Sequence, residues 1–262
     1  MRPTVPLPLA EFPASQIKAV FSDLDDTLTD HSRISPQTFA SLWSLKERGF
    51  WLALVSGRPA GWADCLMRLW PLDAMVFENG AGLMIRRGEK IETISLAQNQ
   101  TRDQQKKRLS EIYETLKKQI PNLKLATDQN YRLFDYALDF CEEPPRLSHA
   151  EVESLLQQLN EQDGITAKLS SIHINYWCGT HTKVTACDYL LKTEGISRNI
   201  TKEQVAYTGD SPNDEPLFEY FPNSVGVANL KPYLPKLRFP PRFLTREPSG
   251  TGFQELVSLL VR

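Results

Sequence analysis

The sequence predicts an α/β protein in which a doubly wound parallel sheet carries an inserted α+β domain. Two observations support this prediction. Short apolar runs that end in polar or glycine-containing turns alternate with helical patterns, and nearly continuous apolar strands are typical of a parallel sheet covered on both faces. Between them, residues 87–179 contain strands that alternate apolar and polar side chains, as in a sheet with one covered face. We therefore expect a large domain of residues 1–86 and 180–262 and a small domain of residues 87–179.

Four strands of the large sheet can be placed because each apolar run stops at a polar turn. Asp23, Ser56 and Asp210 follow three of these runs. The carboxyl ends of parallel strands meet at one edge of a sheet, and ligands of such folds bind there. These three side chains are therefore expected to converge. The runs are residues 17–21, 51–55, 74–77 and 204–207.

Helices are predicted between and after these strands. Ser35 and Pro36 supply an N-cap and a proline at the first helical position, so a helix is expected from there to Gly49. Apolar side chains on the helices and strands are predicted to pack in the core. Further helices are expected over residues 59–69, 183–191 and 252–260. The predicted core residues include Phe39, Leu42, Trp43, Leu45, Trp51, Trp62 and Trp70.

The insert is predicted to pack two amphipathic helices, residues 98–118 and 147–159, on alternating strands. A strand over 134–140 puts its aromatic and leucine side chains on one face and its aspartates on the other. A second strand lies within residues 167–177, and its polar face carries His173, Asn175 and Trp177. This polar face must meet either water or a ligand.

Composition and charge exclude several classes of protein. The 30 lysines and arginines nearly balance the 32 aspartates and glutamates, which removes the broad positive field of a nucleic-acid binder or a polybasic membrane protein. No apolar run approaches the ~18 residues of a membrane span, so we expect a cytoplasmic protein with no nucleic-acid or membrane partner. The four cysteines lack zinc-like spacing and are expected to be reduced.

Paired carboxylates mark the end of the first strand. Asp23 and Asp25 lie two residues apart, so both leave the same side of an extended chain, with Thr27 next in that parity. Two carboxylates held together need a cation or a shared proton, and a hard divalent ion such as Mg²⁺ suits oxygen ligands. DLDDT alone could be a solvated acidic turn, but Asp210 and Asp214 end another strand and enlarge the cluster.

Four short motifs in a fixed order resemble those of the haloacid dehalogenase-like hydrolase superfamily. They are DLDDT from Asp23, VSGR with Ser56, Lys183, and GDSPND with Asp210 and Asp214. The insert between the second and third motifs, preceded by ENGA at residues 78–81, resembles the large α/β cap of subfamily IIB. The resemblance implies a Rossmann-like core with a C2B-type cap, similar to sugar-phosphate, Cof-type and mannosyl-3-phosphoglycerate phosphatases.

The resemblance also implies roles for individual residues. Asp23 would be the nucleophile that takes the phosphoryl group, and Asp25 would be the general acid and base. Mg²⁺ would be held by Asp23, the main-chain carbonyl of Asp25, and Asp210. Asn213 and Asp214 would orient the metal's other ligands and Lys183. The phosphoryl oxygens would be bound by Thr27, Ser56, Gly57 and Lys183.

The chain departs from the family pattern at two positions. Val184 follows Lys183 where glycine is frequent, which bears on how closely that helix can approach the site. Asp26 stands in the first motif where glycine is common, and we expect the turn to tolerate it.

Side chains for the substrate are expected on both domains. Arg58 could bind a phosphate or a substrate carboxylate, or it could form a salt bridge to the cap. Asn79 on the core and His173, Asn175 and Trp177 on the cap are candidate contacts, Trp177 as a surface for sugar stacking. The alternative is that this strand face is merely wetted by solvent.

The leading hypothesis is a Mg²⁺-dependent phosphatase that hydrolyses a small phosphorylated metabolite, a sugar phosphate, through an aspartyl-phosphate on Asp23. A phosphomutase of the phosphomannomutase type has a similar core and cap, and a non-catalytic binding protein with the same fold is a third alternative. Opening of the cap would need hinges, expected near residues 85–88 and 179–182. The expected partner is a small metabolite, bound by a monomer or a homodimer.

Overall fold

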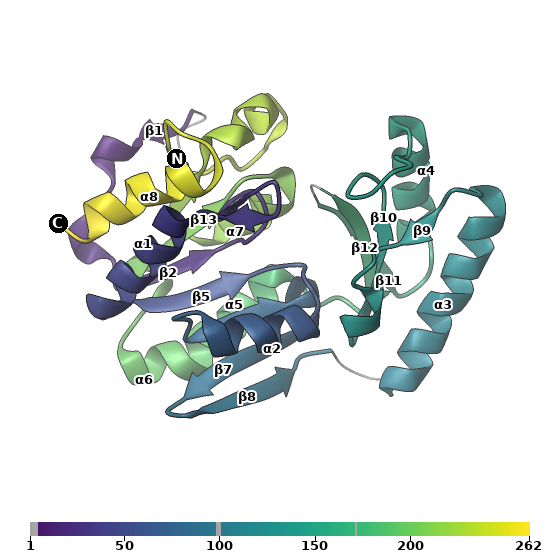
Figure 1. Cartoon of the computed structure of the whole chain (residues 1–262), viewed down its shortest axis with the longest axis horizontal. Helices are drawn as coiled ribbons and strands as arrows, with labels where there is room; N and C mark the ends of the chain where they lie inside the picture. Colours follow the sequence, from purple (N-terminus) through teal and green to yellow (C-terminus); the bar gives the residue numbers. More distant parts are fainter. Residues whose placement is uncertain (1–4, 98–100, 171) are drawn as a thin grey trace.

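The computed structural model describes residues 5–97, 101–170 and 172–262, which form a large and a small unit (Figure 1). The large unit is built on a nine-stranded sheet, counted over these residues, with the order β1-β15-β14-β13-β2-β5-β6-β7-β8. In this sheet order, neighbouring strands pair in parallel from β1 as far as β6, and the last two pairs, β6–β7 and β7–β8, are antiparallel. The strands are β1 (Leu7–Pro8), β2 (Ala19–Ser22), β5 (Trp51–Val55), β6 (Ala74–Phe77), β7 (Gly82–Arg87), β8 (Lys90–Ser95), β13 (Val205–Gly209), β14 (Asn223–Gly226) and β15 (Phe243–Leu244).

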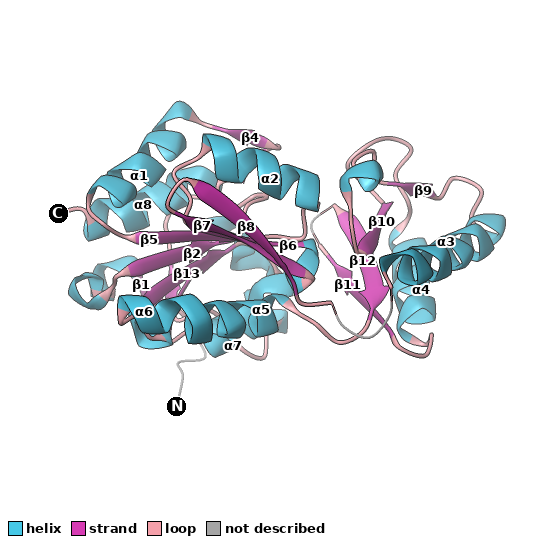
Figure 2. Cartoon of the chain, turned by 90° about the horizontal axis from the view of Figure 1, so that it is seen from below, coloured by secondary structure: helices cyan, strands magenta, loops and turns pink. Residues whose placement is uncertain are grey.

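Helices cover both faces of this sheet, which confirms the doubly wound prediction (Figure 2). Helices α1, α2 and α8 pack on one face around Val20 and Leu52 of the strands. Helices α5 and α7 pack on the other face around Phe21 and Ala53. Neighbouring strand residues belong to different core clusters because successive side chains point to opposite faces. The helices are α1 (Pro36–Glu47), α2 (Ala60–Leu69), α5 (Lys183–Leu190), α6 (Ile196–Arg198), α7 (Glu215–Tyr220) and α8 (Ser249–Leu260).

Helix α1 begins where the sequence predicts, because the Ser35 hydroxyl accepts a hydrogen bond from the Thr38 N–H. Leu42 is buried, but Trp43 is 45% exposed, so the prediction that Trp43 packs in the core is wrong. The next residue along a helix lies about 100° around its axis, which carries Trp43 off the buried stripe. The remaining predicted core residues are buried (Leu45, Trp51) or partly buried against the core (Phe39, Trp62, Trp70).

The small unit is a four-stranded antiparallel sheet with α3 and α4 on one face. Its apolar core lies between that face and the two helices. Residues 167–177 form a hairpin rather than one strand: the chain turns at Ser170, whose N–H donates to the His173 carbonyl. Helix α3 starts after its Thr101 cap, and residues 98–100 of the predicted helix lie outside the described residues. The elements are α3 (Arg102–Gln119), β9 (Lys124–Leu125), β10 (Asp135–Asp139), α4 (His149–Asn160), β11 (Ile165–Leu169) and β12 (His173–Cys178).

The expected domain boundary at residue 87 needs a correction. It falls inside the β7–β8 hairpin, and β8 is the edge strand of the large sheet. The chain therefore leaves the large sheet after Ser95 and returns after Cys178. The expected hinge at 85–88 is the tight turn of this hairpin, where Gly88 has a φ of +62°.

Short elements complete the chain. None of the helices in the described ranges is both long and apolar enough to cross a membrane. The remaining strands are β3 (Thr29–Asp30) and β4 (Arg33–Ile34). Short 3-10 helices cover Leu9–Glu11, Ala14–Gln16, Glu78–Gly80, Gln129–Tyr131, Lys202–Gln204, Pro212–Asp214 and Ala228–Lys236, and a π-helical turn covers Leu191–Gly195.

Candidate active site

The predicted convergence at the carboxyl edge of the large sheet is present. Asp23 follows β2, Ser56 follows β5 and Asp210 follows β13, and all three line one small hollow. His173 and Asn175 of β12 line its opposite side, so the site lies between the sheet edge and the small unit. The enclosed space is about 20 Å³, room for about one water molecule.

A buried cation binds the first aspartate. Lys183, at the start of α5, places its Nζ 2.7 Å from Asp23 Oδ1 and 3.2 Å from Asp214 Oδ1. Burial alone would lower the pKa of Lys183, but the carboxylates of Asp214 and Asp23 raise it above its ordinary value. The ammonium therefore stays charged beside Asp23.

A close approach of α5 to the core makes this contact possible. Gly80 has a φ of +102°, and a side chain there would collide with the Thr182 carbonyl at the cap of α5. Glycine tolerates both conditions. The contact at Gly80 thus brings Lys183 into the site although Val184 replaces the expected glycine. In the same way, Asp26 adopts a φ of +55°, a conformation that aspartate accepts more readily than most residues.

Three buried carboxylates form a group that suits a divalent cation. Oxygens of Asp23, Asp210 and Asp214 lie within 4.8 Å of one another. Both oxygens of Asp214 are occupied: Tyr207 Oη donates to Oδ1 at 2.6 Å, in addition to Lys183, and the Asp210 N–H donates to Oδ2 at 3.1 Å. Asp23 and Asp210 are therefore better placed to bind the ion, and Asp214 orients Lys183.

The charge of this group supports the same conclusion. Burial raises the pKa of Asp23 to about 8 against the lowering influence of Lys183, and burial together with Asp214 and Asp23 raises the pKa of Asp210 well above its usual range. A cation bound between these oxygens favours their ionised forms. Mg²⁺ prefers such oxygen ligands, so the residues present fit the predicted ion.

Asp25 is held by Arg58. The guanidinium donates from Nε to Asp25 Oδ2 at 2.9 Å and from Nη2 to Oδ1 at 2.9 Å, a two-point contact. Burial opposes the charge of Arg58, but Asp25 and two carboxylates of the small unit raise its pKa. Of the two roles expected for Arg58, the structure shows the salt bridge to the cap.

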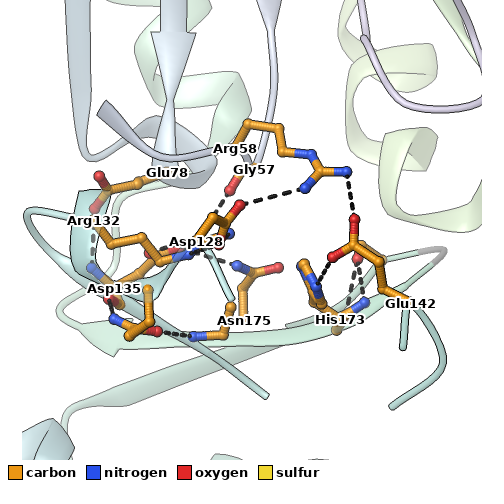
Figure 3. Close-up of polar contacts among 12 residues, drawn as sticks. Gly57, Arg58, Glu78, Asp128, Arg132, Asp135, Glu142, His173 and Asn175 are labelled. Carbon is orange, nitrogen blue, oxygen red and sulfur yellow. Dashed lines mark hydrogen bonds and ion pairs between the residues drawn. The ribbon is translucent and has the colours of Figure 1, made fainter. Parts of the chain in front are cut away.

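That salt bridge joins the two units (Figure 3). Arg58 Nη1 lies 3.3 Å from Asp128 Oδ2, and Nη2 lies 3.1 Å from Glu142 Oε1. The other Glu142 oxygen lies 2.8 Å from His173 Nε2. The close contact with His173 and the charge of Arg58 lower the pKa of Glu142 to about 2. One guanidinium thus faces three carboxylates, those of Asp25, Asp128 and Glu142.

A second buried arginine holds the small unit against the loop that carries Ser56 and Gly57. Arg132 is fully buried, and its Nη1 donates to the Gly57 carbonyl at 2.9 Å and to Asp135 Oδ1 at 3.0 Å. Its Nε donates to Asp128 Oδ1 at 3.1 Å. From the core, the Glu78 carboxylate accepts the N–H groups of residues 133, 134 and 135. The segment before β10 is therefore bound to the core by both charge and backbone hydrogen bonds.

Comparison with known proteins identifies the fold and family of this site. The model for haloacid dehalogenase-like hydrolases matches residues 20–136 and 146–237. The chain belongs to this family. A phosphoglycolate phosphatase of Methanothrix thermoacetophila is 28% identical over 246 residues, which cover 92% of this chain and 96% of that protein. The family and this relative confirm the prediction of a phosphoric monoester hydrolase.

Crystal structures confirm the fold. A Thermoplasma acidophilum protein superposes with a TM-score of 0.74 at 17% identity, covering 94% of this chain and 99% of that one. The sucrose-phosphatase of Synechocystis, solved with sucrose and phosphate, superposes with a TM-score of 0.64 at 19% identity, covering 93% and 98%.

The hydrolase site contains most, but not all, of the predicted residues. Thr27 is buried outside the hollow and donates to Asp210 Oδ1 at 3.3 Å, so it contacts a carboxylate of the acidic group rather than open space. Asn79 also lies outside the hollow and packs against Gly57. The hollow itself is lined by Asp23, Asp25, Ser56, Gly57, Arg58, Lys183, Asp210, Asn213, His173 and Asn175.

Trp177 needs a correction as a sugar-stacking surface. Its side chain is only 1% exposed, stacks on the His181 ring and donates from Nε1 to the His181 carbonyl at 3.2 Å. Strand alternation places Trp177 on the polar face correctly, but the returning chain covers it. His181 therefore covers the face of Trp177 that a sugar would need.

Several functional residues are missed by the sequence reasoning. Asp128, Arg132 and Glu142 lie in loops whose sequence resembles solvated turns, and their partners are distant along the chain. The sequence analysis also does not predict Asn229, whose Nδ2 donates to the Asp26 carbonyl of the first motif at 2.9 Å. Only Glu78 has a local signal, since it begins the ENGA motif.

Proposed function

We propose that this hydrolase is a Mg²⁺-dependent phosphatase that cleaves a small sugar phosphate with Asp23 as nucleophile. The observation that carries the proposal is the buried contact of Asp23 with Lys183 beside Asp210. A carboxylate held against an ammonium at a sheet edge is oriented for attack, and the ammonium can receive a phosphoryl oxygen as charge develops.

Each residue then has a defined part in the reaction. An oxygen of Asp23 forms a bond to phosphorus while the ester bond to the alcohol breaks, and Asp25 gives a proton to the departing alkoxide. Asp25 then takes a proton from the water that hydrolyses the aspartyl-phosphate. Ser56 and Lys183 bind phosphoryl oxygens, and Asp214 with Tyr207 holds Lys183 in place. Mg²⁺ bound by Asp23, Asp210 and the Asp25 carbonyl would neutralise charge on the phosphoryl group.

The leaving-group side of the site favours a neutral, hydroxylated alcohol. The positive charge of Arg58 is already matched by Asp25, Asp128 and Glu142, and His173 contacts Glu142. A carboxylate in the leaving group would meet an excess of negative charge here, whereas hydroxyl groups find donors and acceptors. This arrangement supports a sugar phosphate over phosphoglycolate, which the name of the Methanothrix relative suggests as the second candidate.

The size of the hollow indicates that the substrate enters an opened cap. About 20 Å³ accommodates no phosphate ester, so the contacts of Arg58 with Asp128 and Glu142 must separate while substrate enters, and they re-form when the cap closes over it. We therefore infer an opening motion between the two units, with residues 179–182 as one connecting segment.

Phosphate release tests the nucleophile. We expect wild type to release phosphate from p-nitrophenyl phosphate and hexose phosphates with Mg²⁺ and not with EDTA. Asp23→Asn should lower kcat by about 10³-fold or more, while Asp30→Asn, an exposed carboxamide variant, leaves it unchanged. Release that survives in Asp23→Asn would refute the assignment. Conversion between hexose phosphates without phosphate release would instead identify a mutase, and neither activity in a folded protein would identify a binding protein.

Substrate charge is tested separately. Wild type should prefer hexose 6-phosphates to 2-phosphoglycolate by about tenfold or more in kcat/KM, and Glu142→Gln should narrow this preference. Glu143→Gln, an exposed neighbour 3.8 Å from Lys124, is the matched control. A wild-type preference for phosphoglycolate would leave the phosphatase intact and overturn the sugar-phosphate proposal.

A further inference from the structure

A second hollow lies at the opposite end of the large sheet from the active site. It is formed where β2, β5 and β6 begin and where the chain after α6 turns toward β13. The catalytic residues lie at the carboxyl ends of these strands, so the two hollows are separated by the length of the sheet. This hollow encloses about 380 Å³, within the usual range for metabolite sites.

Its lining is strongly basic in a chain of net charge −2. Lys18, Lys46, Arg48 and Arg198 contribute four cations, and Asp73 contributes the carboxylate. Lys46 Nζ lies 2.5 Å from Asp73 Oδ1, and the Leu52 N–H donates to Oδ2 at 2.9 Å. Both oxygens of Asp73 thus have partners already, Lys46 and the Leu52 N–H at the start of β5.

Three cations remain without a counter-charge. In the described part of the chain, Lys18, Arg48 and Arg198 form no ion pair with a carboxylate, and all three are exposed. Lys18 reaches only a carbonyl, that of Asn199, at 3.5 Å. Like charges gathered around a concave surface create a positive field that attracts an anion.

An aromatic side chain adds a second, independent feature. Trp51 lines the hollow and is 3% exposed, and the Arg198 guanidinium lies over its ring at 5.2 Å from the centroid. The indole Nε1 is buried and finds no hydrogen-bond acceptor among the described residues. Buried donors without partners are rare in native proteins and often indicate a missing water or ligand.

We propose that this hollow binds a small metabolite that carries a diphosphate group. A diphosphate has about three negative charges near neutral pH, which matches the three unpaired cations. The two arginines offer planar, two-point donors suited to phosphate oxygens, and Lys18, the residue before β2, supplies a third positive charge. The site is separate from catalysis and does not depend on the phosphatase assignment.

Calorimetric titration with pyrophosphate tests this proposal. With EDTA present, so that no metal draws the anion to the catalytic carboxylates, we expect one saturable site. Arg48→Gln/Arg198→Gln should weaken binding by about tenfold or more, whereas Lys107→Gln/Lys118→Gln, which removes the same charge from exposed α3, should not. ADP that binds more tightly than pyrophosphate would assign a nucleotide, and equal binding would assign the diphosphate group alone.

Three results would overturn the proposal. One is an absence of saturable binding. Another is equal weakening by the two double variants, which would indicate attraction by overall charge alone. The third is loss of binding in Lys183→Met with no loss in the arginine variant, which would place the anion in the catalytic hollow.

Discussion

Replacing Arg132 by methionine tests the buried ion pairs that hold the cap segment next to Gly57. The guanidinium is fully buried, and it donates to the carboxylates of Asp128 and Asp135 and to the Gly57 carbonyl. Methionine keeps the volume but leaves Asp135, also fully buried, without its cation. Removing one member of a buried ion pair costs about 3–5 kcal/mol, because the remaining charge is uncompensated. We expect a loss of that size in the free energy of unfolding.

A double-mutant cycle separates charge from packing. The double variant Arg132→Met/Asp135→Asn no longer buries an unpaired carboxylate. Its free energy of unfolding should therefore recover about half of what Arg132→Met loses. Arg68→Met, which breaks an exposed two-point contact with Asp64, should leave stability unchanged. Urea unfolding followed by tryptophan fluorescence measures all of these variants. If Arg132→Met were no less stable than Arg68→Met, or if Asp135→Asn restored nothing, the buried ion pair would not stabilise the fold as this reasoning requires.

Three further predictions follow from individual contacts. Burial lowers the pKa of His181 to about 4 from the ordinary 6.5, so the unfolded chain binds a proton that the native chain does not, and stability should fall by up to about 3 kcal/mol as the pH drops from 6.5 to 4. A His181→Gln variant should lose this slope when Tm is measured against pH. Tyr207→Phe removes the donor to Asp214 and should lower kcat about tenfold with little change in Tm. Ser35→Ala removes the N-cap of α1 and should cost about 1 kcal/mol in urea unfolding, with kcat unchanged.

The sequence predicts the elements whose signals are local. The strands before Asp23 and Ser56 are continuous apolar runs, and the start of α1 is marked by Ser35 and Pro36, so each can be placed within a few residues. The first and fourth motifs then meet because parallel strands end at the same edge. The meeting of Asp23 and Asp210 is therefore predictable from the apolar runs that precede them.

The errors arise where the deciding contact is distant. Strand β8 is mostly exposed, as befits an edge strand, so its sequence looks like that of the insert and hides its pairing with β7. Alternation places Trp177 on the correct face but cannot show that His181 returns to cover it. The partners of Arg58 in the cap lie 70 and 84 residues away, beyond the reach of any spacing rule.

These distant contacts link the position of the cap to Asp25 and to the loop that carries Ser56. Arg58 donates to Asp25 and Glu142 at the same time, and Arg132 donates to the carbonyl of Gly57, next to Ser56. Arg58 therefore cannot change its cap partners without changing how the Asp25 carboxylate is held, and Arg132 ties the loop of Ser56 to the same cap segment. Under the proposed function, opening of the cap would loosen both contacts together, so closure of the cap and alignment of Asp25 and Ser56 would be one event.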